Sequence, residues 1–440
     1  MLYYFFRYLN DTFDIPGAGM WGYTSTRAIA ALILSLIIST MFGNWFINYM
    51  KRHNRVEVQR DAATDPFNTG KVGVPTMGGV IIIVATIVPS LLFGRLRNIY
   101  MIMMLISTVW LGALGFLDDL LKARTKDYDR LPRALQWLSE FRGRNADYRA
   151  HNKNGMRPAY KLLGQFILGL SVGLVLWLSP DIVIREGGEL IKSTYTTLPF
   201  VKSHNLDYAG FFAFLGEWQQ AAGWAFFVVM TTFIVMAVSN GSNLNDGLDG
   251  MCAGNSMLMF LAFGALAYFS GHAIWADYFD IMFIPGSQEL VVFIAGFIGA
   301  LVGFLWFNTY PAQIFMGDTG SLAIGGVIGV IAMIIHKELL IPIICFVFLA
   351  ESLSVLLQTQ YAKMGNKRGQ KWRLFMRTPI HDSFRITAAL AEKMESQGIN
   401  ISRIPFRRIR GCMHENRITM RFWITTLIMA AFAIMTLKIR

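Results

Sequence analysis

The chain has 440 residues, of which 54% are hydrophobic and 15% are charged. Soluble domains carry about 25% charged residues, so this composition, together with apolar stretches of roughly 20 residues along the whole length, excludes an ordinary soluble protein. The net charge of +12 needs no nucleic acid as a partner, because membrane proteins collect Lys and Arg on the cytoplasmic side beside anionic lipid. Three scattered cysteines, Cys252, Cys345 and Cys412, form no disulfide or metal-binding pattern.

Hydropathy predicts an all-α, polytopic membrane protein, with ten transmembrane helices in a single domain that covers residues 1–440. The first apolar stretch is not a secretory signal peptide, because it starts after residue 27 and lacks a small-residue cleavage site. The eighth and ninth spans are joined by a short hairpin at His336–Lys337. The ten predicted spans are residues 28–50, 77–93, 99–117, 160–179, 221–239, 252–271, 289–307, 322–336, 339–358 and 421–437.

The distribution of Lys and Arg predicts the orientation of these spans. With ten spans, loops 51–76, 118–159 and 359–420 lie on one side, and they hold 5, 10 and 13 of these residues. The other side, which includes both termini, holds 10. We therefore expect the three basic loops in the cytoplasm and both termini outside it.

Aspartates gather where predicted spans end on the cytoplasmic side. The third span ends in GFLDDLLK, in which Asp118, Asp119 and Lys122 fall within about one helical turn. The fifth span ends in GSNLNDGLDG, which adds Asp246 and Asp249 beside two asparagines. An acidic pair and a second acidic turn are therefore expected on one face of the membrane.

Three more cytoplasmic loops carry polar motifs. The loop after the seventh span, FNTYPAQIFMGDTGSLA, holds Asp318 between glycines. The loop after the ninth span contains RTPIHDSF with His381, and the loop after the first span contains KVGVPTMGG with Lys71. The outer loops have no comparable Gly/Asp motif.

Each motif alone has an ordinary explanation: solvated boundary charge, a helix cap, or a surface histidine. Their concentration on one face favours a site instead. Hard oxygen ligands, glycine-rich turns and the absence of a Cys/His cage are typical of Mg²⁺ with phosphates. Five aspartates exceed what one ion needs, so some are expected to bind a sugar or base, while Lys71 and Lys122 can neutralise phosphate charge.

These motifs, with RFWI at residues 421–424, resemble the phospho-N-acetylmuramoyl-pentapeptide transferases, a branch of the polyprenyl-phosphate N-acetylhexosamine-1-phosphate transferases. The resemblance implies ten helices with both termini periplasmic, a bacterial inner membrane, and an active site that faces the cytoplasm. It implies transfer of phospho-MurNAc-pentapeptide from UDP-MurNAc-pentapeptide to undecaprenyl phosphate, which gives lipid I and UMP with Mg²⁺ in the first membrane step of peptidoglycan synthesis. Membrane lipid is the other partner, and a homodimer is left open.

The resemblance also implies roles for residues at matching positions. Asp118 and Asp119 match the paired acid site and Asp318 matches a metal ligand, so these three are the expected metal site. His381 joins them as the fourth expected catalytic residue. The expected substrate-binding residues are Lys71, Thr76, Lys122, Asn243, Asp246, Asp249, Phe315 and Gln358.

The chain departs from the family at several positions. The family usually has three consecutive histidines where this chain has His381, Asp382 and Ser383, so only the first role is carried over. Asn245 stands where a threonine is usual. Loops 125–157 and 180–219 are enlarged, and no role is predicted for either.

Two alternative functions remain at this stage. A related enzyme that moves GlcNAc-1-phosphate onto the same lipid shares the Asp-rich motifs, although the PIH and PTMGG segments favour the muramoyl-pentapeptide enzyme. A transporter with a carboxylate-lined ion site is the second alternative, but it would place its acids near the bilayer midplane rather than at span ends.

Overall fold

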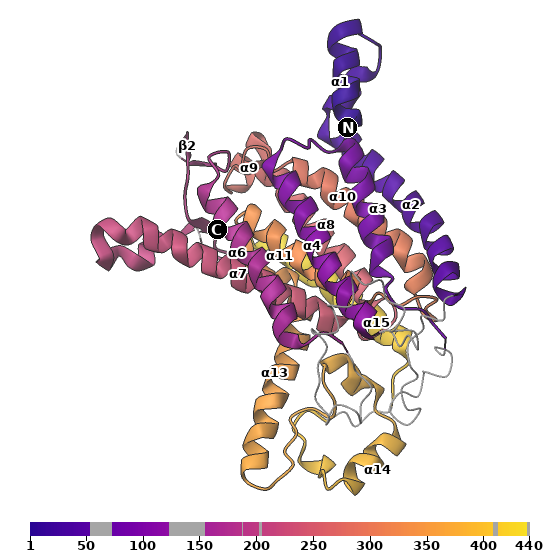
Figure 1. Cartoon of the computed structure of the whole chain (residues 1–440). Coiled ribbons are helices and arrows are strands. Elements are labelled where there is room, and N and C mark those ends of the chain that lie inside the picture. Colours follow the sequence, from indigo (N-terminus) through magenta and orange to yellow (C-terminus); the bar gives the residue numbers. More distant parts are fainter. Residues whose placement is uncertain (53–72, 123–154, 187, 202–204, 408–411, 438–440) are drawn as a thin grey trace, which may run out of the picture.

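Long apolar helices dominate the computed structural model (Figure 1). Eight of them are long and apolar enough to cross a membrane, and a bent pair of helices brings the number to nine among the residues described. A shorter apolar helix of 15 residues, α3, lies beside them. The structure describes residues 1–52, 73–122, 155–186, 188–201, 205–407 and 412–437.

Nine of the ten predicted spans each coincide with one helix of this bundle, and the ninth, residues 339–358, corresponds to a bent pair of helices. The prediction of a helical membrane protein is therefore confirmed, whereas the count of ten depends on α3 and stays a prediction. The helices of the bundle are α2 (Thr24–Arg52), α3 (Gly79–Phe93), α4 (Ile99–Lys122), α6 (Pro158–Leu178), α7 (Gln219–Asn245), α8 (Met251–Ser270), α10 (Glu289–Asn308), α11 (Gly317–Ile334), α12 (Ile341–Ile344), α13 (Phe346–Lys367) and α15 (Glu415–Thr436).

Helix α11 forms the centre of the bundle, with α3, α4, α7 and α8 packed around it. Every residue from Asp318 to Ile334 is buried. Its sequence makes this possible, because glycine and alanine alternate with β-branched residues and let the neighbouring backbones approach closely. A helix that is buried on all sides holds the residues of its first turn, which include Asp318, in a fixed position.

The ninth predicted span, residues 339–358, is not one continuous helix. After the short 3₁₀ helix η7 (Glu338–Leu340), α12 and α13 meet at Cys345 with an angle of 81° between them. Cys345 has φ −95° and ψ 29°, which is outside the helical region, so the change in direction falls at this residue. Helix α13 therefore leaves the bundle and extends away from it (Figure 1).

The prediction of an all-α chain needs a correction in the enlarged loop 180–219. Two antiparallel hairpins form there, one from β1 (Ile184–Glu186) and β2 (Glu189–Ile191) and one from β3 (Tyr195–Thr197) and β4 (Asn205–Asp207). The TYTT segment is rich in β-branched and aromatic residues, which favour strands. The 3₁₀ helix η6 (Ala209–Trp218) then leads into α7, and α9 (Ala273–Phe279) follows α8.

The N-terminal segment contains α1 (Leu2–Phe13) and η1 (Ala18–Gly22). The terminal amine donates to the carbonyls of Leu91 and Leu92 at the end of α3. At the other end of the chain, Phe432 in α15 contacts Phe200 in the connection between β3 and β4. The start of α1 therefore lies beside the end of α3, and the last turns of α15 lie beside the connection between β3 and β4.

The segment between α13 and α15 folds into a small unit of its own (Figure 1). It contains the 3₁₀ helices η8 (Ile380–Arg385) and η9 (Ile401–Arg403) and the helix α14 (Ala388–Ser396). Five apolar side chains make a separate core in this unit: Met376, Leu390, Met394, Ile399 and Ile404. This core lets the basic loop hold a defined shape instead of collapsing onto the bundle.

Candidate active site

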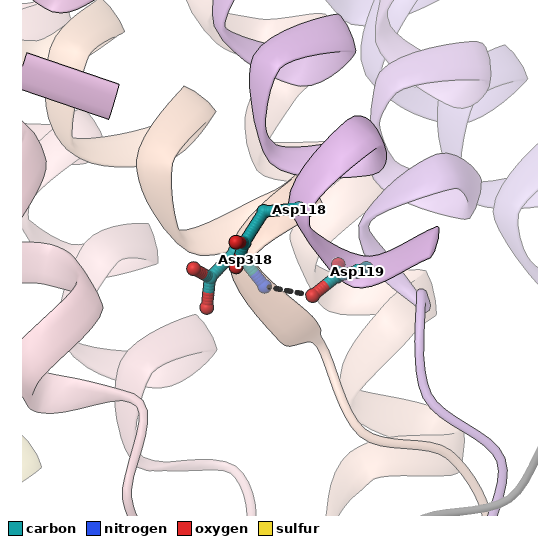
Figure 2. A group of neighbouring side chains, drawn as sticks. All are labelled: Asp118, Asp119 and Asp318. Carbon is teal, nitrogen blue, oxygen red and sulfur yellow. Dashed lines mark hydrogen bonds between the residues drawn. The ribbon is translucent and has the colours of Figure 1, made fainter. Parts of the chain in front are cut away.

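Three carboxylates meet where α4 ends and α11 begins (Figure 2). Asp118 and Asp119 belong to the last turn of α4, and Asp318 belongs to the first turn of α11. Each offers an oxygen that lies within 4.8 Å of the others, and all three residues are buried. The structure thus brings together the three residues expected to bind metal, although about 200 residues separate the two helices in sequence.

Asp119 caps the N-terminus of α11. Its Oδ1 accepts the Asp318 N–H at 3.0 Å, and its Oδ2 accepts the Thr319 N–H at 2.9 Å and the Thr319 hydroxyl at 2.6 Å. The first N–H groups of a helix have no partner inside it, and a carboxylate there also interacts favourably with the helix dipole. Gly317 permits this contact, because its φ of +73° and the 2.6 Å between an added Cβ and Asp119 Oδ2 leave no room for a side chain.

Two lysines bridge the other two carboxylates. Lys122 Nζ lies 2.6 Å from Asp118 Oδ2 and 2.9 Å from Asp318 Oδ1. Lys161 Nζ lies 2.7 Å from Asp118 Oδ2 and 2.6 Å from Asp318 Oδ2. The acid–base pairing predicted within the last turn of α4 is therefore present, and Lys161 from α6 is an additional member of the site.

The three carboxylates are suitable ligands for a divalent cation that prefers oxygen ligands. Asp118 accepts the Met156 N–H at 2.7 Å besides the two ammonium groups, and Asp119 already accepts three hydrogen bonds. A carboxylate has about four lone-pair sites. The partners of Asp118 and Asp318 include two lysine side chains that a cation could displace, so these two carboxylates are the freer ligands, although Asn243 also donates to Asp318. Three carboxylates against two ammonium groups leave a formal charge of −1, which also favours a cation.

The 243–249 turn forms the next wall of the site. Asn243 at the end of α7 donates its amide to Asp318 Oδ1 at 3.0 Å and to Ser321 Oγ at 2.9 Å. Asp246 caps the end of α7 and is partly exposed. Asp249 is buried, and its Oδ2 accepts the Ala312 N–H at 3.0 Å, so this carboxylate holds the turn to the loop before α11.

The remaining predicted substrate-binding residues occupy different places. Phe315 pairs through its backbone with the segment around Thr76, because the Phe315 N–H donates to Pro75 O and the Gly78 N–H donates to Phe315 O. Gln358 in α13 accepts the Leu374 and Phe375 N–H groups, which gives it a role in fixing the start of the next loop. Lys71 lies outside the described residues.

His381 approaches the same turn from the opposite side. It is buried in η8, and its Nε2 lies so close to Gly247 that an added Cβ there would be 2.1 Å from it. The loop that carries it folds back under the bundle. Asn243 and Gly247, four residues apart, thus connect the acidic cluster with the one histidine that matched the family.

Comparison with known proteins supports one assignment. A family model described as glycosyl transferase family 4 matches residues 101–336, more than half of the chain. The phospho-N-acetylmuramoyl-pentapeptide-transferase of Phocaeicola vulgatus is 54% identical over 455 residues, which cover 100% of both chains. The proteins of the same name from Bacteroides thetaiotaomicron and Flavobacterium psychrophilum are 54% and 41% identical, again over 100% of both chains.

The chain belongs to the phospho-N-acetylmuramoyl-pentapeptide-transferase family. The resemblance inferred from the sequence motifs is therefore confirmed. The family match covers the elements from α4 to α11, which supply the three aspartates, both lysines and Asn243. Lys161 could not be predicted from the sequence as a member of this cluster, because it stands alone at the edge of an apolar span, with no acidic neighbour to mark it.

Proposed function

We propose that the chain transfers phospho-MurNAc-pentapeptide from UDP-MurNAc-pentapeptide to undecaprenyl phosphate, giving lipid I and UMP. Full-length identity to the curated transferases supports this substrate pair. The structural observation that carries it is the convergence of Asp118, Asp318, Lys122 and Lys161 at one helix N-terminus. A set of two bridging lysines among carboxylates suits a reaction between two phosphate-bearing substrates.

The reaction is a phosphoryl transfer in which one pyrophosphate bond replaces another. A phosphate oxygen of the lipid attacks the phosphorus linked to the sugar, a new P–O bond forms, and the P–O bond to UMP breaks, so that UMP leaves with the electron pair. The second pKa of a phosphate monoester is near 6, so much of the lipid phosphate is already a dianion at neutral pH. The main task is thus to bring two anions together, and we assign it to Lys122 and Lys161.

We propose Mg²⁺ as the cofactor, held by Asp118 and Asp318, with Asp119 fixing the backbone of Asp318. Bound there, the ion would neutralise phosphate charge as a Lewis acid. Asn243 orients Asp318 from the side, since its amide donates to that carboxylate. The aspartates act first as metal and orientation ligands and only second as bases.

We further propose that the acidic end of the bundle faces the cytoplasm of a bacterial inner membrane. The excess of Lys and Arg in loops 51–76, 118–159 and 359–420 supports this orientation, and it places both termini in the periplasm. A nucleotide-linked substrate made in the cytoplasm would then reach Asp246 and the turn directly, while the lipid phosphate would enter from the bilayer.

The test is an assay of the purified protein with undecaprenyl phosphate and each of two donors, UDP-MurNAc-pentapeptide and UDP-GlcNAc, with and without Mg²⁺. We expect release of UMP with the muramoyl donor only, and loss of this release after chelation. Turnover of UDP-GlcNAc alone would assign the related GlcNAc-1-phosphate activity instead. Turnover of neither donor would refute the proposal.

A further inference from the structure

The buried side chain of Glu351 lies beside His381, on the side of the ring away from the 243–249 turn. Glu351 in α13 is fully buried, and its Oε1 accepts the backbone N–H of His381 at 3.3 Å. Its Oε2 lies 3.2 Å from Nδ1 of the same histidine. One carboxylate therefore faces both the backbone and the ring of a residue that is 30 positions away in sequence.

The opposite edge of the His381 ring faces the 243–249 turn. Nε2 is pressed against Gly247, between Asp246 and Asp249, and lies 3.9 Å from Asp382 Oδ1. Asp382 also lies 3.4 Å from Arg377 and 3.6 Å from Arg385, so two guanidinium groups balance its charge. Glu351 has no such partner among the described residues, where His381 is its only ion-pair contact.

This arrangement indicates where the imidazole carries its proton. Oε2 of Glu351 and Nδ1 of His381 lie 3.2 Å apart, and neither has a hydrogen-bond partner in the described part of the chain. Buried polar atoms normally have a hydrogen-bond partner, and an ionised carboxylate can only accept. A small rotation of the ring would let an Nδ1–H donate to Oε2, and in the neutral ring the lone pair then falls on Nε2, at the edge that faces the turn.

We propose that Glu351 is a positioning residue, which holds His381 in its Nδ1–H tautomer so that Nε2 faces a substrate phosphate or hydroxyl bound at the 243–249 turn. This inference rests on the proposed function, because it needs a substrate at that turn. Glu351 itself touches no reacting atom and acts through the ring. A carboxylate behind a site histidine fixes both its orientation and its basicity in the same way as an outer-shell partner of a metal ligand.

The first test is the tautomer itself, which does not depend on activity. Protein labelled with ¹⁵N at histidine is studied in detergent at about pH 8.5, where a neutral imidazole has one N–H, and the His381 signals are assigned with His381→Ala. We expect the Nδ1–H tautomer in the unaltered protein. Finding the hydrogen on Nε2 would overturn the proposal without any variant of Glu351.

The second test uses Glu351→Gln, which can still accept the His381 backbone N–H through its carbonyl. Its amide N–H₂ would then face Nδ1 and move the ring hydrogen to Nε2. We expect kcat to fall by roughly 10- to 100-fold, the usual cost of losing an outer-shell partner, with KM for the donor little changed. Glu351→Asp keeps a carboxylate and should recover the tautomer and part of kcat.

Two controls separate positioning from folding. Glu338→Gln changes another buried glutamate, which accepts the Tyr208 hydroxyl at 2.8 Å at the opposite end of the bundle, and should lower the melting temperature without changing kcat. The double variant Glu351→Gln with His381→Ala should be no slower than His381→Ala alone. Additive losses in that double variant, or an unchanged tautomer with unchanged kcat in Glu351→Gln, would refute the proposal, whereas inactivity of the unaltered protein would refute only the proposed function.

Discussion

Lys161 offers the sharpest test of how the acidic cluster works. In Lys161→Met the chain keeps its apolar stem but loses the ammonium group that lies 2.7 Å from Asp118 and 2.6 Å from Asp318. Lys122 then remains as the only lysine between these two carboxylates among the described residues. We expect weaker donor binding and slower transfer, together with a lower Mg²⁺ concentration for half-maximal activity, because the ammonium no longer competes for the same oxygens.

The size of the loss follows from the hydrogen bond that the Lys161 ammonium would donate to a substrate phosphate. A hydrogen bond to a charged group contributes roughly 1.5–3 kcal/mol. The Lys161 side chain is 20% exposed, so solvent screens part of this energy, and we take about 1.5–2 kcal/mol. At about 1.36 kcal/mol for each factor of ten, this corresponds to a decrease in kcat/KM of roughly 10- to 30-fold.

The assay is UMP release at several donor and Mg²⁺ concentrations, with melting temperature measured in parallel. Lys192→Met is a matched control, since among the described residues Lys192 donates to Ser179 O and lies over Trp224, away from the carboxylates. A Lys161→Met variant with kcat/KM within twofold of the unaltered protein would show that this lysine has no part in the reaction. A Mg²⁺ requirement that rises instead of falling would refute the idea that lysine and metal share ligands.

Three further predictions concern residues that the sequence motifs assign to the site. Asp318→Asn should abolish turnover while the protein still inserts and folds, and near-normal Mg²⁺-dependent activity in that variant would remove Asp318 from the metal site. Lys71→Ala should raise KM for the donor, since a lost phosphate contact costs roughly 1.5–3 kcal/mol, and an unchanged KM would place it outside the nucleotide site. His381→Ala should lower kcat by about 10²-fold, whereas Asp382→Ala and Ser383→Ala should be milder; equal losses at all three positions would contradict a special part for His381.

The sequence was sufficient for the bundle and for the acidic residues. Apolar runs of membrane-spanning length have few alternatives in lipid, because every backbone polar group must be satisfied within the segment. Asp118, Asp119 and Asp318 could be selected because dense carboxylates at span ends are rare and because they matched family motifs. Their meeting point is confirmed by the geometry, as is the pairing of Lys122 with Asp118.

Other features could not be predicted because they depend on tertiary contacts. The break at Cys345 has no glycine or proline of its own, although Pro342 lies three residues earlier, so hydropathy alone predicted one straight span over residues 339–358. Glu351 sits within an apolar run, where a single acid gives no indication of its partner. Glu351 contacts His381 only because the loop between them folds back toward α13, and no local sequence pattern predicts that fold.

The same carboxylates, Asp118 and Asp318, can bind either the two lysines or a cation. Asp119 is fixed by three hydrogen bonds to residues 318 and 319, so it anchors the backbone whatever binds nearby. Lys122 and Lys161 instead reach the cluster through long, flexible stems, and their side chains are 39% and 20% exposed. We infer that an arriving diphosphate draws these two ammonium groups away from Asp118 and Asp318, which frees carboxylate oxygens for the cation. Donor and Mg²⁺ should consequently bind with positive coupling, and because the lysines transmit that coupling, it should shrink in Lys161→Met.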